Sequence, residues 1–201
     1  MLRVLAIFLG LVAALPAGQV FAQPFHHAYD EWRQYSRDWL GACPDAINEE
    51  AIDYYGTHCF ASTGTQSLND ANLPAYKLTI LLDRLDGGLD IAFTASPTDG
   101  TQVDETRPLI ITFGGEPPME FAFGTDLETR HNTSNMYFVA PPEKRDALIA
   151  AIQARNAATL TLPVLGPEDT ETEDIWFSMR GVLASIDFMK TYARRVEGYD
   201  E

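Results

Sequence analysis

Basic residues are scarce in this chain. Its 201 residues include 14 Lys and Arg against 29 Asp and Glu, which gives a net charge of −15 at pH 7. A surface with this charge repels nucleic-acid phosphates and anionic lipid head groups. We therefore expect no nucleic-acid partner. A basic partner or a cation would suit the charge, although most acidic proteins are simply well hydrated.

Long apolar runs are scarce as well. Residues 4–15 are apolar apart from Gly10 and follow the basic Arg3, while residues 20–22 offer the small side chains that signal peptidase reads. The run is shorter than the roughly 20 residues needed to cross a bilayer, and no second run of that length follows. We predict that residues 1–22 are a secretory signal peptide. Residues 23–201 would then be a single periplasmic or secreted domain that is not inserted in a membrane.

The chain has only two cysteines, Cys43 and Cys59. In an exported protein an even pair predicts a structural disulfide. A redox pair normally has the closer C-x-x-C spacing. If the cysteines were free, His58 could activate the neighbouring Cys59 thiol, an alternative that disappears once the disulfide forms.

The common catalytic and metal-binding motifs are absent: there is no G-x-S-x-G, H-E-x-x-H, P-loop or EF-hand loop. We assign no catalytic, cofactor-binding or metal-ligating residue and expect no cofactor. His26 and His27 are adjacent, so they make a poor metal site by themselves, and we expect hydrated surface side chains. Residues 168–174 form an acidic run without the glycine and ligand spacing of a calcium loop. We expect them to form a solvated loop.

The first third of the mature chain has aromatic residues at helical spacing. Between residues 23 and 40 this spacing predicts an amphipathic helix, whose end around Trp39 could equally be extended. Residues 45–55 also begin like a helix, with Asp45 as a candidate N-cap.

From Tyr76 onward the apolar period changes to two, which predicts β-strands. The predicted strands cover residues 76–82, 89–95, 108–113, 119–123, 136–139, 159–164 and 175–179. Asp86-Gly87-Gly88 predicts a hairpin turn between the first two strands. Helices are predicted at residues 142–155 and 182–196. Together these elements favour a mainly β, α+β fold, an antiparallel β-sandwich with helical segments at both ends of the domain.

Residues 176–185, WFSMRGVLAS, resemble the closing segment of the invasion-associated locus B family. In these exported bacterial proteins a strand ends in a Ser-Leu-Lys-Gly-Phe-like sequence and leads into a helix of small residues. Residues 39–43, WLGAC, resemble the Trp-x-x-x-Cys opening of the family, with Cys59 as the second cysteine. The further cysteine pair that the family commonly has in its middle section is missing here.

The resemblance implies a periplasmic or surface β-sandwich and transfers no catalytic residues. We therefore expect a non-enzymatic protein that binds an unidentified protein or envelope component. One alternative is a secreted hydrolase with scattered carboxylates, for which the candidates are Asp83, Asp86, Asp90 and Glu116. The other is a carrier of a small ligand or lipid. A hydrolase needs a cleft with convergent polar groups, and a carrier needs an enclosed apolar cavity.

Overall fold

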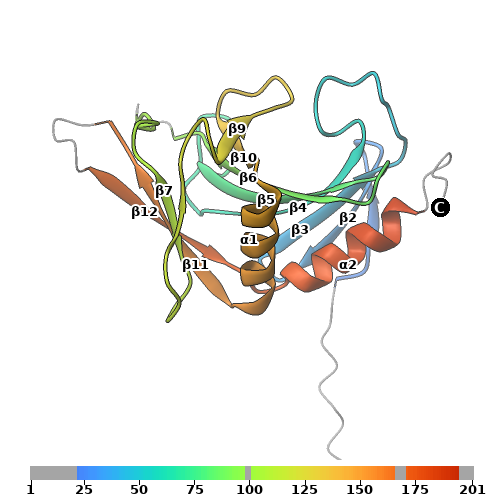
Figure 1. Cartoon of the computed structure of the whole chain (residues 1–201). Coiled ribbons are helices and arrows are strands. Elements are labelled where there is room, and N and C mark those ends of the chain that lie inside the picture. Colours follow the sequence, from blue (N-terminus) through green and yellow to red (C-terminus); the bar gives the residue numbers. More distant parts are fainter. Residues whose placement is uncertain (1–21, 98–100, 166–170, 195–201) are drawn as a thin grey trace, which may run out of the picture.

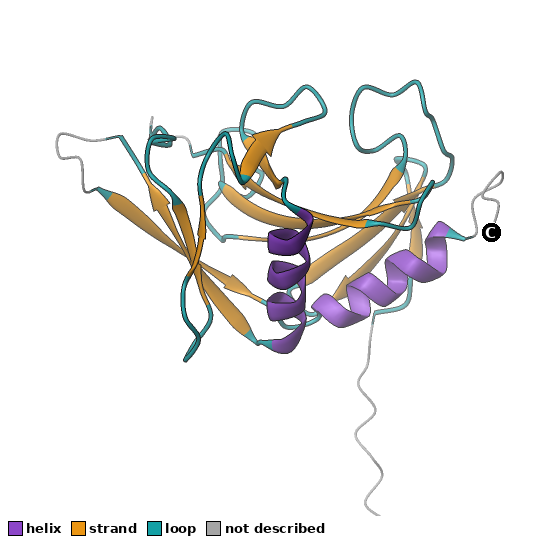
Figure 2. Cartoon of the chain, in the orientation of Figure 1, coloured by secondary structure: helices purple, strands orange, loops and turns teal. Residues whose placement is uncertain are grey.

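A computed structural model describes residues 22–97, 101–165 and 171–194. Within them the chain forms two antiparallel β-sheets and two helices (Figures 1 and 2). The strands of the larger sheet are, in spatial order, β1 (Phe25–His27), β2 (Glu31–Ser36), β3 (Trp39–Pro44), β4 (His58–Gly64), β5 (Tyr76–Asp83), β6 (Leu89–Ala95), β10 (Met136–Val139) and β9 (Leu127–Thr129). The predicted signal peptide lies outside the described residues, apart from Ala22.

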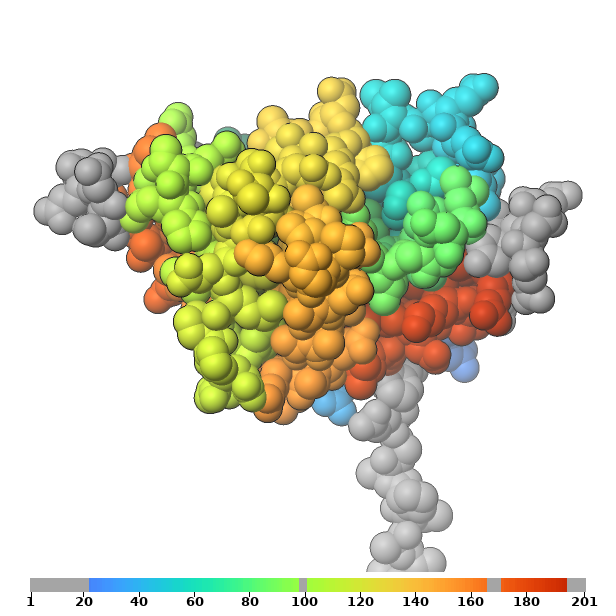
Figure 3. Space-filling model, in the orientation of Figure 1, coloured from blue at the N-terminus to red at the C-terminus, as the bar shows by residue number. Residues whose placement is uncertain are grey.

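The smaller sheet and the helices cover the inner face of the larger sheet. The smaller sheet has the order β12 (Thr172–Ser178), β11 (Ala157–Pro163), β7 (Leu109–Thr112) and β8 (Met119–Phe121). Helix α2 (Val182–Ala193) packs on β2, β3 and β4, and α1 (Pro142–Ala154) packs beside β6, β10 and α2. The two helices adjoin on one face of the molecule (Figure 3). No helix of the described chain is long and apolar enough to cross a bilayer.

The main core lies between these layers. The alternating apolar residues of β5 and β6 point inward, and Phe93 of β6 meets the edge of Phe177 of β12 with 6.3 Å between ring centroids. Cys43 and Cys59, on neighbouring strands, are buried in this core and joined by a disulfide. The predicted mainly β, α+β fold is therefore confirmed.

The end of β12 is tied to the turn between β2 and β3. The indole Nε1 of Trp39 donates to the Ser178 carbonyl at 2.9 Å, and the Ser178 hydroxyl donates to the Asp38 carboxylate at 2.6 Å. Gly181 follows with φ 102°, a conformation that strains any residue with a side chain, and starts α2. Just before this corner, Phe177 and Met179 are buried in the core, whereas Trp176 is exposed.

The predicted N-terminal helix is wrong, because residues 25–44 form β1, β2 and β3. The aromatic side chains do line up on one face, but that face belongs to a β-hairpin and not to a helix. Trp32 and Ser36 are four residues apart on one strand and so share a face, and Ser36 pairs with Trp39 across the turn. Helical spacing of three and four residues can therefore also arise across a tight hairpin. The left-handed Arg37, φ 58°, closes that turn.

Residues 45–57 form a chain of turns where a second helix was predicted. This segment packs over the outer face of the larger sheet through Tyr54, which lies in a second apolar cluster with Phe60, Leu81 and Phe138. The acidic run also differs from the prediction. Residues 168–170 lie outside the described residues, whereas Thr172–Asp174 belongs to β12. The Glu173 carboxylate accepts a hydrogen bond from the Tyr76 hydroxyl.

Candidate functional site

A groove of about 630 Å³ crosses the outer face of the larger sheet over strands β2 to β6. Its floor consists of side chains that the two-residue period of these strands turns away from the core. The register aligns Tyr35 of β2 with Leu40 of β3 and Ser62 of β4, and aligns Lys77 of β5 with Thr94 of β6. The loops before β2, before β4 and before β5 supply the walls, with Tyr29, Tyr55, Asn69, Leu73 and Pro74.

Three tyrosines around this groove are exposed: Tyr29 by 76%, Tyr35 by 49% and Tyr55 by 43%. Neighbouring rings hold two of them in place. Tyr35 stacks on Phe25 with 6.2 Å between ring centroids, and Tyr55 stacks on Tyr54 at 4.4 Å. Tyrosine combines a large apolar ring with a polar hydroxyl, and it is enriched in protein interfaces. The groove therefore has preformed aromatic walls that are open to solvent.

The groove also contains cations without a counter-charge. Lys77 is half-buried on the floor, and its burial lowers the pKa of the amino group. Within the part of the chain that the structure describes, neither Lys77 nor Arg37 makes a hydrogen bond or an ion pair with another side chain. The third cation, Arg33, is paired with Glu31 through a 2.5 Å hydrogen bond from Nε. The acid at the rim, Asp38, already accepts the hydrogen bond from Ser178.

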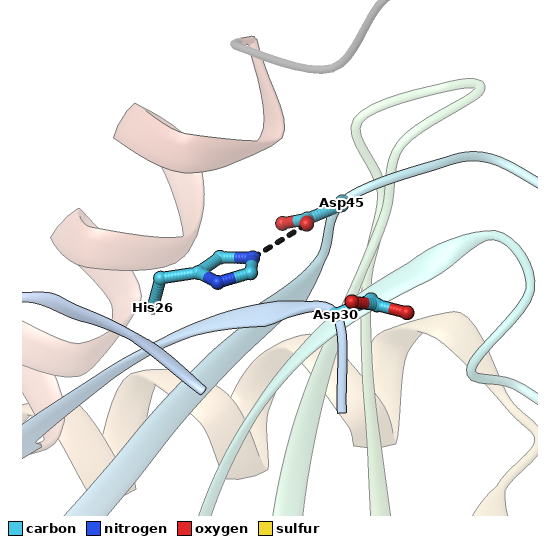
Figure 4. A group of neighbouring side chains, drawn as sticks. All are labelled: His26, Asp30 and Asp45. Carbon is cyan, nitrogen blue, oxygen red and sulfur yellow. Dashed lines mark hydrogen bonds and ion pairs between the residues drawn. The ribbon is translucent and has the colours of Figure 1, made fainter. Parts of the chain in front are cut away.

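His26 belongs to a separate cluster at the edge of the larger sheet (Figure 4). Its Nε2 lies 2.6 Å from Asp45 Oδ2, and one donor atom each from His26, Asp30 and Asp45 lie within 4.8 Å of one another. Sequence reasoning considered only the adjacent His27 and missed both carboxylates, because the hairpin and the end of β3 bring them together. An imidazole and two carboxylates are donor types that Zn²⁺ accepts. All three side chains are exposed, however. His26 and Asp45 already contact each other, and this contact links β1 to the residue after β3, so their proximity needs no metal ion to explain it.

The four carboxylates considered for a hydrolase do not line the groove. Asp83 and Asp86 accept hydrogen bonds from backbone N–H groups in their own turn, those of Leu85 and Gly88. Asp90 forms an ion pair with an arginine of the loop after β9, and Glu116 forms one with the arginine that follows α1. Local turns and ion pairs therefore account for all four side chains.

His58 lies beside the disulfide and is partly buried under the loop before β4. Its Nδ1 is 2.8 Å from the Thr57 hydroxyl and its Nε2 is 3.8 Å from Asp83 Oδ2, and its ring meets that of His131 edge to face with 5.7 Å between centroids. Burial lowers the pKa of His58, and Asp83 partly opposes this shift. Because Cys59 is bonded to Cys43, His58 has no free thiol to activate.

A carrier of a small ligand or lipid would need an enclosed apolar cavity, and the place for one is the space between the two sheets. A gap lined by core side chains of β5, β6, β7 and α1, among others, has a volume of about 10 Å³. That is at most room for one water molecule. It is far below the roughly 300 Å³ of a small-molecule pocket.

No family model and no curated protein sequence matches this chain. Among solved structures, the chain is similar to invasion associated protein b from Bartonella henselae, with a TM-score of 0.52 and 15% sequence identity. The match covers 81% of this chain and 98% of that chain. The resemblance found in residues 39–43 and 176–185 is therefore confirmed for the fold.

Proposed function

We propose that this is an exported, non-enzymatic binding protein that holds a partner protein in the outer-face groove. The observation that carries the proposal is the groove itself, with its exposed tyrosine walls and its unpaired Lys77 and Arg37. Tyrosine and arginine are among the residues that dominate binding energy in protein interfaces. Such side chains give little to folding when they are exposed, so their gathering at one groove favours a binding role.

Export is supported by three features together. Residues 1–22 have the composition of a secretory signal. The buried Cys43–Cys59 disulfide suits an oxidising compartment. The fold is similar to that of invasion associated protein b from Bartonella henselae.

The test compares groove variants with a matched surface variant. We expect Tyr35→Ala combined with Tyr55→Ala to abolish capture of the partner from an envelope extract, because truncation of interface aromatics typically costs over 1 kcal/mol each. Trp176→Ala is the control, since Trp176 is 62% exposed on the other sheet. The purified protein is immobilised after export, captured proteins are identified by mass spectrometry, and binding is repeated with the purified partner. Equal capture of the partner by the parent, the double tyrosine variant and the Trp176→Ala control would show that the groove is not the binding site.

A further inference from the structure

We infer that the groove receives an extended acidic segment of the partner, whose carboxylates pair with Lys77 and Arg37. This inference rests on the proposed function and adds the chemistry of the ligand. It is drawn from the groove's unpaired polar groups, its length and its charge relative to the rest of the molecule.

Two polar groups of the groove floor, on Lys77 and Thr94, have no partner among the described residues. A half-buried ammonium group loses hydration, and this cost is recovered only when an anion or acceptor approaches it. Lys77 has no such partner among the described residues. The hydroxyl of Thr94, which pairs with Lys77 in the sheet register, is also buried without a hydrogen-bond partner there. The floor is therefore incompletely satisfied in the free protein.

The groove is long enough to hold an extended peptide segment. The groove crosses five neighbouring strands, β2 to β6. At about 4.8 Å between strands this spans on the order of 19 Å, the length of about six extended residues. Arg37 stands in the β2–β3 turn and Lys77 on β5, so two carboxylates of one extended segment can reach separate cations. The tyrosine walls offer contact surface to the side chains between them.

The charge of the groove differs in sign from the net charge of the molecule. The whole chain has a net charge of −15, which repels an anionic membrane. At physiological salt, charges more than about 8 Å apart are largely screened. A short acidic segment inside the groove therefore interacts mainly with the charges that line it, which are three cations, Arg33, Arg37 and Lys77, and one carboxylate, Asp38. An anionic bilayer, which is too broad to enter, meets the acidic surface.

The experiment uses a random octapeptide library displayed on phage, selected on the immobilised exported protein. We expect the selected peptides to be enriched in Asp and Glu. A fluorescein-labelled selected peptide is then titrated by fluorescence anisotropy. Lys77→Met should weaken its binding by about tenfold or more, because it removes a charge from a partly desolvated pair. Arg37→Asn should weaken binding as well, and Asn suits the left-handed backbone at that position.

Lys190→Met is the matched control, because Lys190 is an exposed lysine on α2 outside the groove, and it should leave the affinity unchanged. Thermal melting checks that each variant is folded. Selected peptides without acidic enrichment, or equal affinities for Lys77→Met and the parent, would overturn the inference. Binding of inorganic phosphate as tight as that of the peptide, or binding to phosphatidylglycerol vesicles that Lys77→Met abolishes, would also overturn it. If partner capture depends on Tyr35 and Tyr55 but not on Lys77, the proposed function stands and this inference fails.

Discussion

Arg84 is a charged side chain that is only 1% exposed, and it closes the loop between β3 and β4. Its guanidinium donates to the carbonyls of Pro44 at 2.8 Å, Ala46 at 2.7 Å and Gly56 at 3.3 Å. Pro44 ends β3, whereas Ala46 and Gly56 lie in the turns of the loop, so one side chain holds separate backbone segments together. The planar guanidinium, which has several N–H donors, therefore links the start and the end of this loop by hydrogen bonds.

We predict that Arg84→Met lowers the free energy of unfolding by about 3 kcal/mol. Methionine keeps the apolar stem but removes the donor of these three hydrogen bonds, and hydrogen bonds to charged groups contribute about 1.5–3 kcal/mol each. Urea denaturation followed by tryptophan fluorescence measures the change. Arg155→Met removes an exposed ion pair instead and should stay within about 0.5 kcal/mol of the parent. An Arg84→Met protein as stable as Arg155→Met would contradict this role.

At the scale of elements, strands with a buried face could be predicted from the sequence, and irregular segments could not. The structure places β6 at residues 89–95, as predicted. The prediction was possible because one face of this strand lies in the core, which produces an alternation of apolar and polar residues in the sequence. Residues 45–55 gave a false helical signal, because their apolar Tyr54 anchors a loop on the outer face. The groove was missed for a related reason. In the sequence, Lys77 is simply one of the polar residues that alternate with apolar residues along β5. Only the tertiary structure shows that its amino group has no hydrogen-bond or ion-pair partner among the described residues.

Gly181 tests the junction between β12 and α2. With φ 102°, a Cβ built at this position would lie 1.7 Å from the Ser36 carbonyl oxygen, so the turn after β2 and the start of α2 would have to move apart. We expect Gly181→Ala to destabilise the protein by at least about 3 kcal/mol, through backbone strain and overpacking together. Gly114→Ala is the control, since nothing lies within 4 Å of its Cβ position. Thermal unfolding compares the two. Equal melting temperatures would mean that the sheet and helix do not meet this closely.

At the scale of the whole molecule, most lysine and arginine side chains of the described residues form ion pairs or hydrogen bonds within the protein. Arg107 pairs with Asp104, Lys144 with Asp126, and an arginine after β9 with an aspartate of β6. These pairs leave the excess acidic charge on the surface. Lys77 and Arg37 form no ion pair among the described residues, which is also true of some exposed cations such as Lys190, but these two line one groove.

The stability of the whole molecule should depend on pH through His58. Burial lowers the pKa of His58 in the folded state, and the nearby Asp83 only partly opposes this shift. The unfolded chain therefore takes up a proton as the pH falls through about 6.5, while the folded protein still has a neutral ring. The unfolded state binds more protons in this window, so stability falls as the pH is lowered from 7 toward 5.

Two carboxylates titrate in a different window. The pKa of Asp104 is lowered by hydrogen bonds from Thr106 and Arg107, and that of Asp126 by Lys144. Their stabilising contributions are present above the unfolded pKa of about 3.9 and are lost only as the pH falls below it. Between pH 7 and 5, the expected loss of stability therefore comes from His58 rather than from these two carboxylates.

We predict that His58→Gln reduces the difference in unfolding free energy between pH 7 and pH 5, whatever its effect on stability at pH 7. Glutamine can keep a hydrogen bond to the neighbouring Thr57 hydroxyl but takes up no proton in this range. Urea denaturation at the two pH values measures the difference. His27→Gln, on the edge strand β1, is the control and should keep the parent's pH dependence. If His58→Gln loses as much stability as the parent between pH 7 and 5, another group governs acid sensitivity, and the neutral imidazole under the loop before β4 contributes nothing to it.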